Sequence, residues 1–231
     1  MKYIRIFDDH ATFINPAIQT DQHKHHALEM IVSRDGIIHI EDAFGNALAS
    51  QAVLVLPDQL HQTTTTGETT FVFIEPESDL AKVILTTFNS TQSIQSIEGS
   101  ISEVDRKAFA GGGIPTSLPK TIKYVNLIDD RVQRATDFIR SHITTHEFNL
   151  EMLAEMACLS TSRFTHLFKD QVGIPLRPFI LWCRMRVAVT SVLAGMTITQ
   201  AAYEAGFSDT AHLSRTFMDM FGVNPSAVLK Q

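Results

Sequence analysis

Residues 197–222 read Thr-Ile-Thr-Gln-Ala-Ala-Tyr-Glu-Ala-Gly-Phe-Ser-Asp-Thr-Ala-His-Leu-Ser-Arg-Thr-Phe-Met-Asp-Met-Phe-Gly, and they decide the fold of the second half of the chain. Thr197 and Gln200 have the spacing of a capping box, which predicts a helix start. Apolar residues then recur at helical spacing, and Gly206 stands where a left-handed residue closes a helix. A second helix is predicted after Ser208. Two short helices joined by a glycine turn predict a helix-turn-helix motif.

The same pattern occurs about 48 residues upstream. Asn149 is the predicted cap of the first helix, and Cys158 takes the place of Gly206. A repeat of this length is typical of duplicated supersecondary units. We therefore predict two helix-turn-helix motifs, at about 150–171 and 198–220, held apart by a long helix over Pro175–Leu193.

The paired motifs resemble a known family. The resemblance rests on four segments: Leu-Ala-Glu-Met-Ala-Cys-Leu-Ser (153–160), Arg-Phe-Thr-His-Leu-Phe-Lys (163–169), Leu-Trp-Cys-Arg-Met-Arg-Val-Ala (181–188) and Ala-Gly-Phe-Ser-Asp-Thr-Ala-His-Leu-Ser-Arg-Thr-Phe (205–217). With these segments, residues 129–229 resemble the DNA-binding domain of the AraC/XylS family of bacterial transcription regulators. The resemblance implies an all-α domain of about seven helices over 127–231 that binds double-stranded DNA.

The outward faces of the two second helices supply the candidate DNA-binding residues. In the first helix, the family pattern favours Ser162, Thr165 and His166 for base edges. Arg163 and Lys169 are expected nearer the phosphates. In the second helix the outward residues are Thr210, Ala211, Ser214 and Arg215. Arg215 is the expected guanine reader, because a bidentate guanidinium is the commonest specific contact to DNA. The alternative for each residue is a solvated helix face.

The acidity of the chain lies in its first half. Residues 1–128 carry 9 Lys and Arg against 15 Asp and Glu, whereas residues 129–231 carry 10 of each. DNA binding by a neutral half depends on which of its basic groups face the phosphates. The family usually has basic residues after the position of Phe217, whereas this chain has Met-Asp-Met. We therefore expect weaker phosphate contacts from the second motif.

Composition and termini favour a cytoplasmic protein. The N-terminal residues lack the pattern of a secretory signal, and the sequence has no apolar run near the roughly 20 residues of a membrane span. The two cysteines, Cys158 and Cys183, are predicted to be buried or half-buried thiols in a reducing compartment.

The first half predicts a small all-β barrel or sandwich with one or two helices. Short apolar runs alternate with turn residues at Tyr3–Phe7, Ala27–Val32, Gly36–Ile40, Ala52–Leu56 and Thr70–Ile74. Residues 49–61 are similar to a cupin-type segment of AraC-family sensor domains, with Ser50 and Asp58 in place of the usual glycines. We therefore predict a cupin-like sensor domain over 1–110.

Two helices are predicted after the strands, at Asp79–Asn89 and Ile94–Phe109. The resemblance implies that a helix in this region forms a homodimer; the alternative is that both helices simply pack on the barrel. The glycines and prolines between Gly111 and Pro119 then indicate an interdomain linker over 111–126.

A histidine-rich segment is the strongest candidate for a ligand site in the first half. His23, His25 and Glu29, followed by Gly36, match the spacing of the first cupin metal motif, and His61 from a later strand would complete the set. On a regular strand the first three side chains share one face. Three imidazoles and a carboxylate suit one transition-metal ion. The alternative is a metal-free pocket for an organic effector. His26 and His39 are predicted to point away from the set.

These observations predict a cytoplasmic transcription regulator rather than an enzyme. Its barrel would sense a small molecule or a metal ion and thereby control promoter binding and the recruitment of RNA polymerase. The alternative is a metal-dependent cupin enzyme with an appended DNA-binding domain, which would use the same four ligands. Against that alternative, no further general acid or base stands out in the predicted strands.

Overall fold

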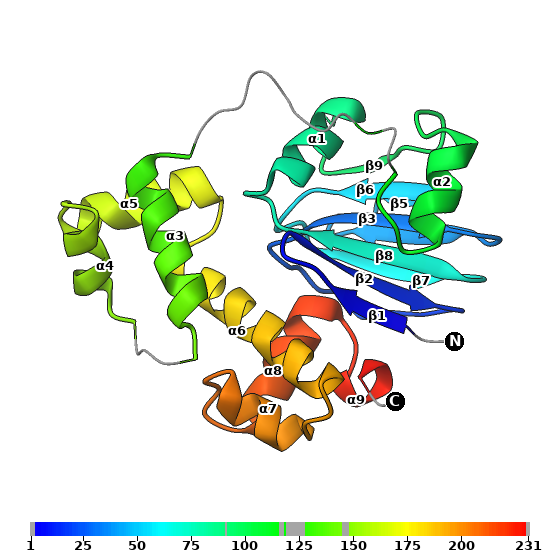
Figure 1. The fold of residues 1–231 in the computed structure, drawn as a ribbon. Helices are drawn as coiled ribbons and strands as arrows, with labels where there is room; N and C mark the ends of the chain where they lie inside the picture. The colour runs from blue at the N-terminus through cyan, green and yellow to red at the C-terminus, as the bar shows by residue number, and fades with distance from the viewer. Residues whose placement is uncertain (1–2, 91, 116–117, 119–127, 145–147, 230–231) are drawn as a thin grey trace. The chain divides into compact units, whose positions relative to one another are not determined.

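The computed structural model describes residues 3–90, 92–115, 118, 128–144 and 148–229 (Figure 1). The contacts divide the chain into two compact units. The first unit, called here the β-unit, comprises residues Met1–Val125 and Met218–Val228, and the helical unit comprises Asn126–Phe217 and Leu229–Gln231. Most of the predicted linker, residues 116–117 and 119–126, lies outside the described residues, as does Leu127. The predicted boundaries at 110 and 127 stay predictions.

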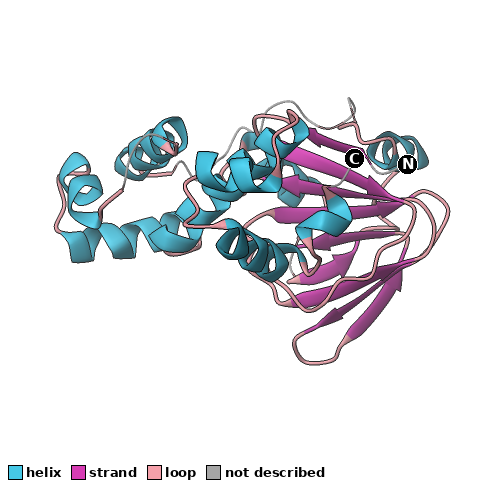
Figure 2. Cartoon of the chain, turned by 90° about the horizontal axis from the view of Figure 1, so that it is seen from below, coloured by secondary structure: helices cyan, strands magenta, loops and turns pink. Residues whose placement is uncertain are grey.

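Among its described residues, the N-terminal part of the β-unit (residues 1–125) contains two antiparallel sheets and two helices (Figure 2). The larger sheet has the order β1-β2-β8-β3-β6-β9, and the smaller has the order β5-β4-β7. The strands are β1 (Tyr3–Ile6), β2 (His10–Asn15), β3 (Leu28–Ser33), β4 (Ile38–Asp42), β5 (Ala47–Ser50), β6 (Ala52–Val55), β7 (His61–Thr65), β8 (Thr69–Ile74) and β9 (Ile94–Ser96). The helices are α1 (Asp79–Thr87) and α2 (Glu103–Ala110). The predicted β-rich first half with one or two helices is confirmed.

Strand β3 is buried on both faces, because different layers cover its two sides. Met30 and Val32 belong to the apolar cluster that packs beneath α1 and α2. Ile31 belongs to the cluster between the two sheets, together with Ile38 of β4. Side chains alternate along a strand, so Glu29 lies on the same side as Ile31, toward the interior. The double burial explains the uninterrupted apolar run in this part of the sequence.

The predicted helix over Ile94–Phe109 is wrong in its first half. Ile94 begins strand β9 and pairs with Val55 at the edge of the larger sheet. Helix α2 starts only after Ser102, whose hydroxyl accepts the N–H of Asp105 at 3.1 Å. The apolar residues from Ile94 onward are spaced as in a helix, but this segment folds as a strand and a turn before the helix begins.

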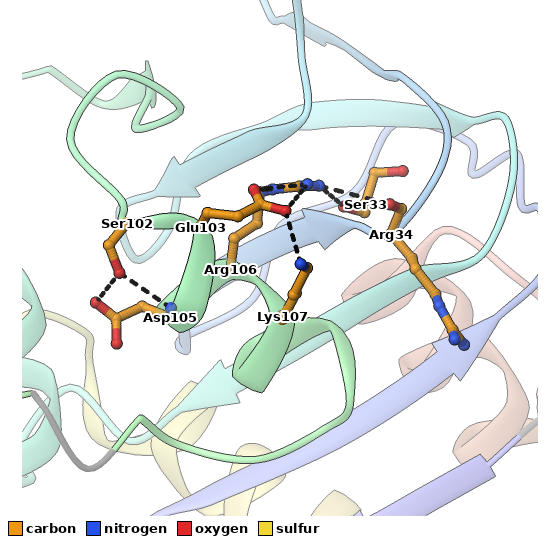
Figure 3. A network of polar contacts seen from close by, with 7 residues as sticks. All are labelled: Ser33, Arg34, Ser102, Glu103, Asp105, Arg106 and Lys107. Carbon is orange, nitrogen blue, oxygen red and sulfur yellow. Dashed lines mark hydrogen bonds and ion pairs between the residues drawn. The ribbon is translucent and has the colours of Figure 1, made fainter.

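Helix α2 is tied to the end of β3 by a polar network (Figure 3). Arg106 donates from Nη1 to the carbonyl oxygen of Ser33 at 3.1 Å, and its Nε donates to the Glu103 carboxylate at 3.0 Å. Exposed ion pairs of this kind contribute at most about 1 kcal/mol. The main anchor is Phe109, which is fully buried against the larger sheet.

The first residues of the predicted linker close helix α2. The N–H of Gly113 donates to Ala108 O at 3.1 Å, and the N–H of Gly112 donates to Phe109 O at 2.8 Å. Gly112 has a φ of +76°. These two bonds and the left-handed residue form a Schellman motif. The glycine run that predicted a flexible linker thus begins as an ordered helix end.

The C-terminal half contains seven helices among its described residues, as predicted. They are α3 (Asp130–His142), α4 (Leu150–Met156), α5 (Thr161–Val172), α6 (Leu176–Leu193), α7 (Ile198–Glu204), α8 (Thr210–Phe221) and α9 (Pro225–Val228). Around α5, the aromatic rings of Phe164, Phe168 and Phe179 pack in sequence, with centroids 5.7 and 5.5 Å apart. Within the described parts of the chain, each helix is too short or too polar to cross a membrane.

Candidate DNA interface and histidine cluster

Both predicted helix-turn-helix motifs form, with their predicted caps. Asn149 accepts the N–H of Met152 at 2.7 Å and starts α4. Thr197 and Gln200 make the predicted capping box at the start of α7. The small apolar residues of α7 are fully buried, which lets the next helix approach closely: Ala201, Ala202 and Ala205.

The turns of the two motifs have the same hydrogen bonds. In the second motif, Phe207 N–H donates to Ala202 O and Gly206 N–H donates to Tyr203 O. In the first motif, the corresponding bonds run from Leu159 to Ala154 and from Cys158 to Glu155. Gly206 has a φ of +76° and Cys158 a φ of +53°. Cys158 therefore adopts the left-handed conformation that favours glycine. Its side chain is exposed, contrary to the prediction of a buried or half-buried thiol, whereas Cys183 is buried as predicted.

The candidate DNA-binding residues lie on the outward faces of α5 and α8. Six are exposed: Ser162, Arg163, His166, Lys169, Ala211 and Arg215. Three are half-buried: Thr165, Thr210 and Ser214. The hydroxyl of Thr165 donates back to its own helix, to Ser162 O at 2.9 Å, so only its lone pairs and methyl group are available to a base.

Sequence reasoning missed Asp209 at the start of α8. Its carboxylate accepts the N–H of His212 at 2.6 Å and so caps the helix. This bond is the largest cause of the lowered pKa of Asp209, and the positive charge of Arg215 acts in the same direction. An acidic residue directly before a helix is a recognisable cap signal. Its negative charge beside Arg215 weakens the attraction of this face for phosphate.

The predicted histidine set meets in the β-unit. The ligand atoms of His23, His25 and His61 all lie within 4.8 Å of one another, and all three side chains are buried. The carboxylate oxygen Oε2 of Glu29 lies 3.2 Å from Nε2 of His61 and 3.4 Å from Nε2 of His25. All four predicted ligands are therefore brought together, with Glu29 adjoining the three imidazoles.

The placement of this set on a regular strand was wrong. His23 and His25 precede β3, and His23 forms only an isolated bridge with His61. His26 points elsewhere, as predicted, with Nε2 at 2.5 Å from the Glu77 carboxylate. His39 is exposed on β4. The His26–Glu77 pair joins residues 51 positions apart, and no local pattern indicates it.

Each of the three imidazoles is oriented by a backbone carbonyl group. Nδ1 of His23 lies 2.9 Å from Asp21 O, Nδ1 of His25 lies 3.1 Å from Ala27 O, and Nδ1 of His61 lies 2.8 Å from Gln59 O. A carbonyl oxygen only accepts, so each Nδ1 carries a proton and donates it. In the neutral imidazole, Nε2 then carries a lone pair. This orientation by an outer hydrogen bond is typical of metal-ligating histidines.

Electrostatics in the cluster call for a positive charge between these groups. A lone pair on Nε2 facing an ionised carboxylate is repulsive unless a proton or a metal ion lies between them. In the described part of the chain, neither Nε2 of His61 nor Oε2 of Glu29 makes a hydrogen bond of acceptable geometry. Buried polar atoms are rarely left in this state.

The pKa shifts show which groups can carry that charge. Burial alone would lower the pKa of His61, but its contact with the Glu29 carboxylate outweighs burial and raises the pKa. Burial lowers the pKa of His23 to about 3, helped by positive charge on His61 and His25. Burial alone would raise the pKa of Glu29, but the contacts with His25 and His61 outweigh burial and hold the pKa well below its usual range. His23 is therefore neutral and Glu29 ionised at pH 7, which are the protonation states that metal ligation requires.

Comparisons with known proteins address the helical half. A family model described as a helix-turn-helix domain matches residues 153–231. The arabinose operon regulatory protein of Escherichia coli K12 is 32% identical over 103 residues, which are 43% of this chain and 34% of that protein. Residues 153–231 of this chain are therefore a helix-turn-helix domain. The transcriptional activator RhrA of Rhizobium meliloti is 29% identical to this chain over 91 residues, which are 38% of this chain and 29% of that protein.

Solved structures extend the likeness in fold to both halves of the chain. ToxT from Vibrio cholerae O395 superposes with a TM-score of 0.64 at 14% identity, covering 96% of this chain and 98% of that one. At that identity the likeness concerns the fold alone. The chain spans about a third of the length of the curated relatives that it matches.

Proposed function

We propose that this protein is a sequence-specific transcription regulator that binds double-stranded DNA through both helix-turn-helix motifs. The observation that carries the proposal is the pair of completed motifs, each with its cap, its left-handed turn and an exposed polar face on the second helix. Two recognition helices in consecutive major grooves would lie about 34 Å apart along the duplex.

The proposed contacts divide between base edges and phosphates. Arg215 is the proposed guanine reader on α8, and Ser162 and His166 are the proposed base readers on α5. Arg163 and Lys169 are exposed beside them and are proposed to contact phosphates. Thr165, Thr210, Ala211 and Ser214 complete the proposed interface. Backbone amides near Thr145 are also proposed to contact phosphates, and that segment lies outside the described residues.

A direct test is the recovery of discrete fragments from sheared genomic DNA by the full-length protein. We expect the double variant Arg163→Ala, Arg215→Ala to lose that enrichment. Arg134→Ala removes an exposed arginine from α3, away from both second helices, and is the matched control that should retain it. Equal enrichment by the double variant would contradict the proposal.

We also propose that the β-unit is the sensor and that its ligand is a transition-metal ion held by His23, His25, Glu29 and His61. Support comes from the three Nδ1 hydrogen bonds, which orient the imidazoles, and from the burial of all four groups. Oε2 of Glu29 lies 3.2 Å from Nε2 of His61 and 3.4 Å from Nε2 of His25, and both distances are close to the ligand–ligand separation of about 3.3 Å expected for a tetrahedral zinc site. A bound ion would place positive charge beside the Glu29 carboxylate in this buried cluster.

An organic effector is the other candidate ligand. One ToxT structure is bound to (E)-4-(8-methylnaphthalen-1-yl)but-3-enoic acid and another to an unsaturated fatty acid. In the present chain, the space between the two sheets is occupied by a packed apolar cluster: Phe13, Ile31, Ile38, Ile40, Val53, Val55 and Phe71. This packing favours an ion over a bulky organic molecule.

Elemental mass spectrometry of the full-length protein tests the site. We expect about one equivalent of a transition metal, lost in His61→Ala and retained in His39→Ala, which removes an exposed histidine outside the set. A metal-free protein that gains no thermal stability from zinc, nickel, iron, manganese or copper would contradict the metal site and leave the organic effector.

We propose that the protein acts in the cytoplasm, as a homodimer and through RNA polymerase, without an enzymatic activity of its own. The alternative, a metal-dependent cupin enzyme, would need a catalytic group beside the four ligands. Turnover of an added substrate by metal-loaded protein, unaffected by Arg215→Ala, would favour that alternative.

A further inference from the structure

The C-terminal segment Met218–Val228 clusters with the β-unit rather than with the preceding helices. Two backbone hydrogen bonds join it to the loop that carries His23 and His25. The N–H of Asp21 donates to Gly222 O at 2.8 Å, and the N–H of Lys24 donates to Asp219 O at 3.3 Å. The loop that supplies two of the proposed metal ligands is therefore bonded on both sides of His23.

Gly222 makes the closest approach in this segment. A Cβ atom at this position would lie 2.3 Å from Asp21 O and 2.7 Å from Nδ1 of His23, and the φ of Gly222 is +65°. The carbonyl group of Asp21 is also the acceptor that orients His23. Any side chain at position 222 must therefore displace the segment, the imidazole or the carbonyl that holds it.

An aromatic residue of the same segment, Phe221, also packs near the histidine cluster. The ring of Phe221 meets that of Phe73 edge-on at 5.4 Å, and its centroid lies 6.3 Å from that of His25. His25 also packs edge-on against Phe73, at 5.2 Å. The segment thus contributes both backbone and side-chain cover to the histidine cluster, whose members are at most 4% exposed.

We propose that Met218–Val228 is a lid on the histidine site, and that its closure slows release of the bound metal ion. The inference rests on the proposed metal site. The ligand nitrogens of the three imidazoles lie within 4.8 Å of one another, and a tetrahedral site places such atoms roughly 3.3 Å apart, so any wider pair closes when an ion binds. His23 and its carbonyl partner Asp21 adjoin the lid at Gly222, so any adjustment of either group takes place against the lid. Because binding linkage is reciprocal, the state of the lid changes metal affinity and the metal changes the state of the lid.

The lid also has a place in regulation. It follows directly on Phe217 and includes the last residues of α8, whose first turns carry Ser214 and Arg215. A change in metal occupancy would therefore act on the chain segment that ends the second recognition helix. The lid and the proposed DNA-reading residues Ser214 and Arg215 are thus joined by one continuous helix, α8.

The test compares metal release from full-length protein loaded with Co²⁺, followed by transfer to a coloured chelator. In Gly222→Ala, the added Cβ atom clashes with Asp21 O and pushes the lid away from the site. Phe221→Ala removes the aromatic ring from the lid without straining the backbone. We expect each variant to release metal about ten-fold faster, as loss of contacts worth about one or two hydrogen bonds predicts. Gly173→Ala is the matched control. Gly173 closes α5 with a φ of +89°, but a Cβ there meets nothing within 4 Å, so release should stay at the wild-type rate.

The outcomes separate the lid from the site. Full metal content with unchanged release in both lid variants would overturn the lid and leave the metal site standing. Equal acceleration in Gly173→Ala would also overturn it, because backbone strain alone would then explain the effect. A wild-type protein that binds no Co²⁺ would overturn the site and the lid together.

Discussion

The two helix-turn-helix motifs share a backbone design but differ in the residue at the turn. Both turns have the same pair of hydrogen bonds and a left-handed residue. In the second motif a Cβ at Gly206 would lie 3.2 Å from Nε of Arg184 on α6, so the guanidinium occupies the space of a side chain. In the first motif the side chain of Cys158 is exposed. The turn therefore requires a left-handed residue in both motifs, whereas the neighbouring helix determines whether that residue has room for a side chain.

The motifs also differ in charge. Helix α5 presents Arg163 and Lys169, whereas the acids Asp209 and Asp219 are exposed at the two ends of α8. Phosphate contacts supply sequence-independent affinity, and base contacts supply specificity. We therefore expect the first motif to contribute more of the affinity and the second to contribute specificity mainly through Arg215.

The largest expected effect is that of Arg215→Ala on binding to the preferred DNA site. Loss of a bidentate guanine contact should cost about 1–3 kcal/mol, and discrimination at one base pair should relax. Fluorescence anisotropy on matched specific and random duplexes measures both quantities. A uniform loss on both duplexes would instead identify Arg215 as a phosphate contact.

Gly206→Ala should destabilise the helical unit by about 1–2 kcal/mol, because alanine must adopt a left-handed conformation and displace Arg184. Chemical denaturation measures the change in the free energy of unfolding. Arg184→Ala in the same background should recover the part of the loss that comes from collision. No recovery would show that backbone strain alone is responsible.

Lys169→Ala should weaken binding to specific and random DNA alike and reduce the slope of log K against log salt by about 0.9. The same substitution should leave the base preference unchanged. Titration at several salt concentrations measures the slope. A change in base preference with an unchanged slope would place Lys169 at a base edge.

The smallest expected effect is a gain. Cys158→Gly should stabilise the helical unit by about 0.5 kcal/mol, since relief of left-handed strain is partly offset by the greater flexibility of glycine when unfolded. Denaturation curves of the two proteins measure it. A loss of stability would mean that the exposed Cys158 side chain makes favourable contacts that outweigh the strain.

Much of the helical half could be predicted from the sequence, because helix caps and helical spacing are formed by residues close together in the chain. The capping box at Thr197 and the cap at Asn149 lie within a few residues of the helices that they start. The β-unit was harder. Strand β7 is rich in threonine, and β5 is rich in alanine, so neither shows the apolar run that identified β1, β3, β4, β6 and β8. Their pairing with β4 supplies what the local sequence lacks.

The histidine site was predicted in its members but not in its geometry. The spacing of His23, His25 and Glu29 identifies them as a set, but the first two lie on an irregular segment that their neighbours orient. The carbonyl acceptors and the close approach of Gly222 involve backbone positions, which side-chain patterns do not indicate. Contacts such as His26–Glu77 depend on tertiary structure alone.

The most direct test of the account is binding-site selection by the full-length protein from randomised duplexes, followed by footprinting of the selected site. We expect two protected elements about 10 base pairs apart on one face of the duplex. Ser162→Ala with His166→Ala should alter the preference at one element, and Arg215→Ala should alter it at the other. A single element that responds to only one motif, or no enriched sequence, would contradict the claim that both motifs read DNA.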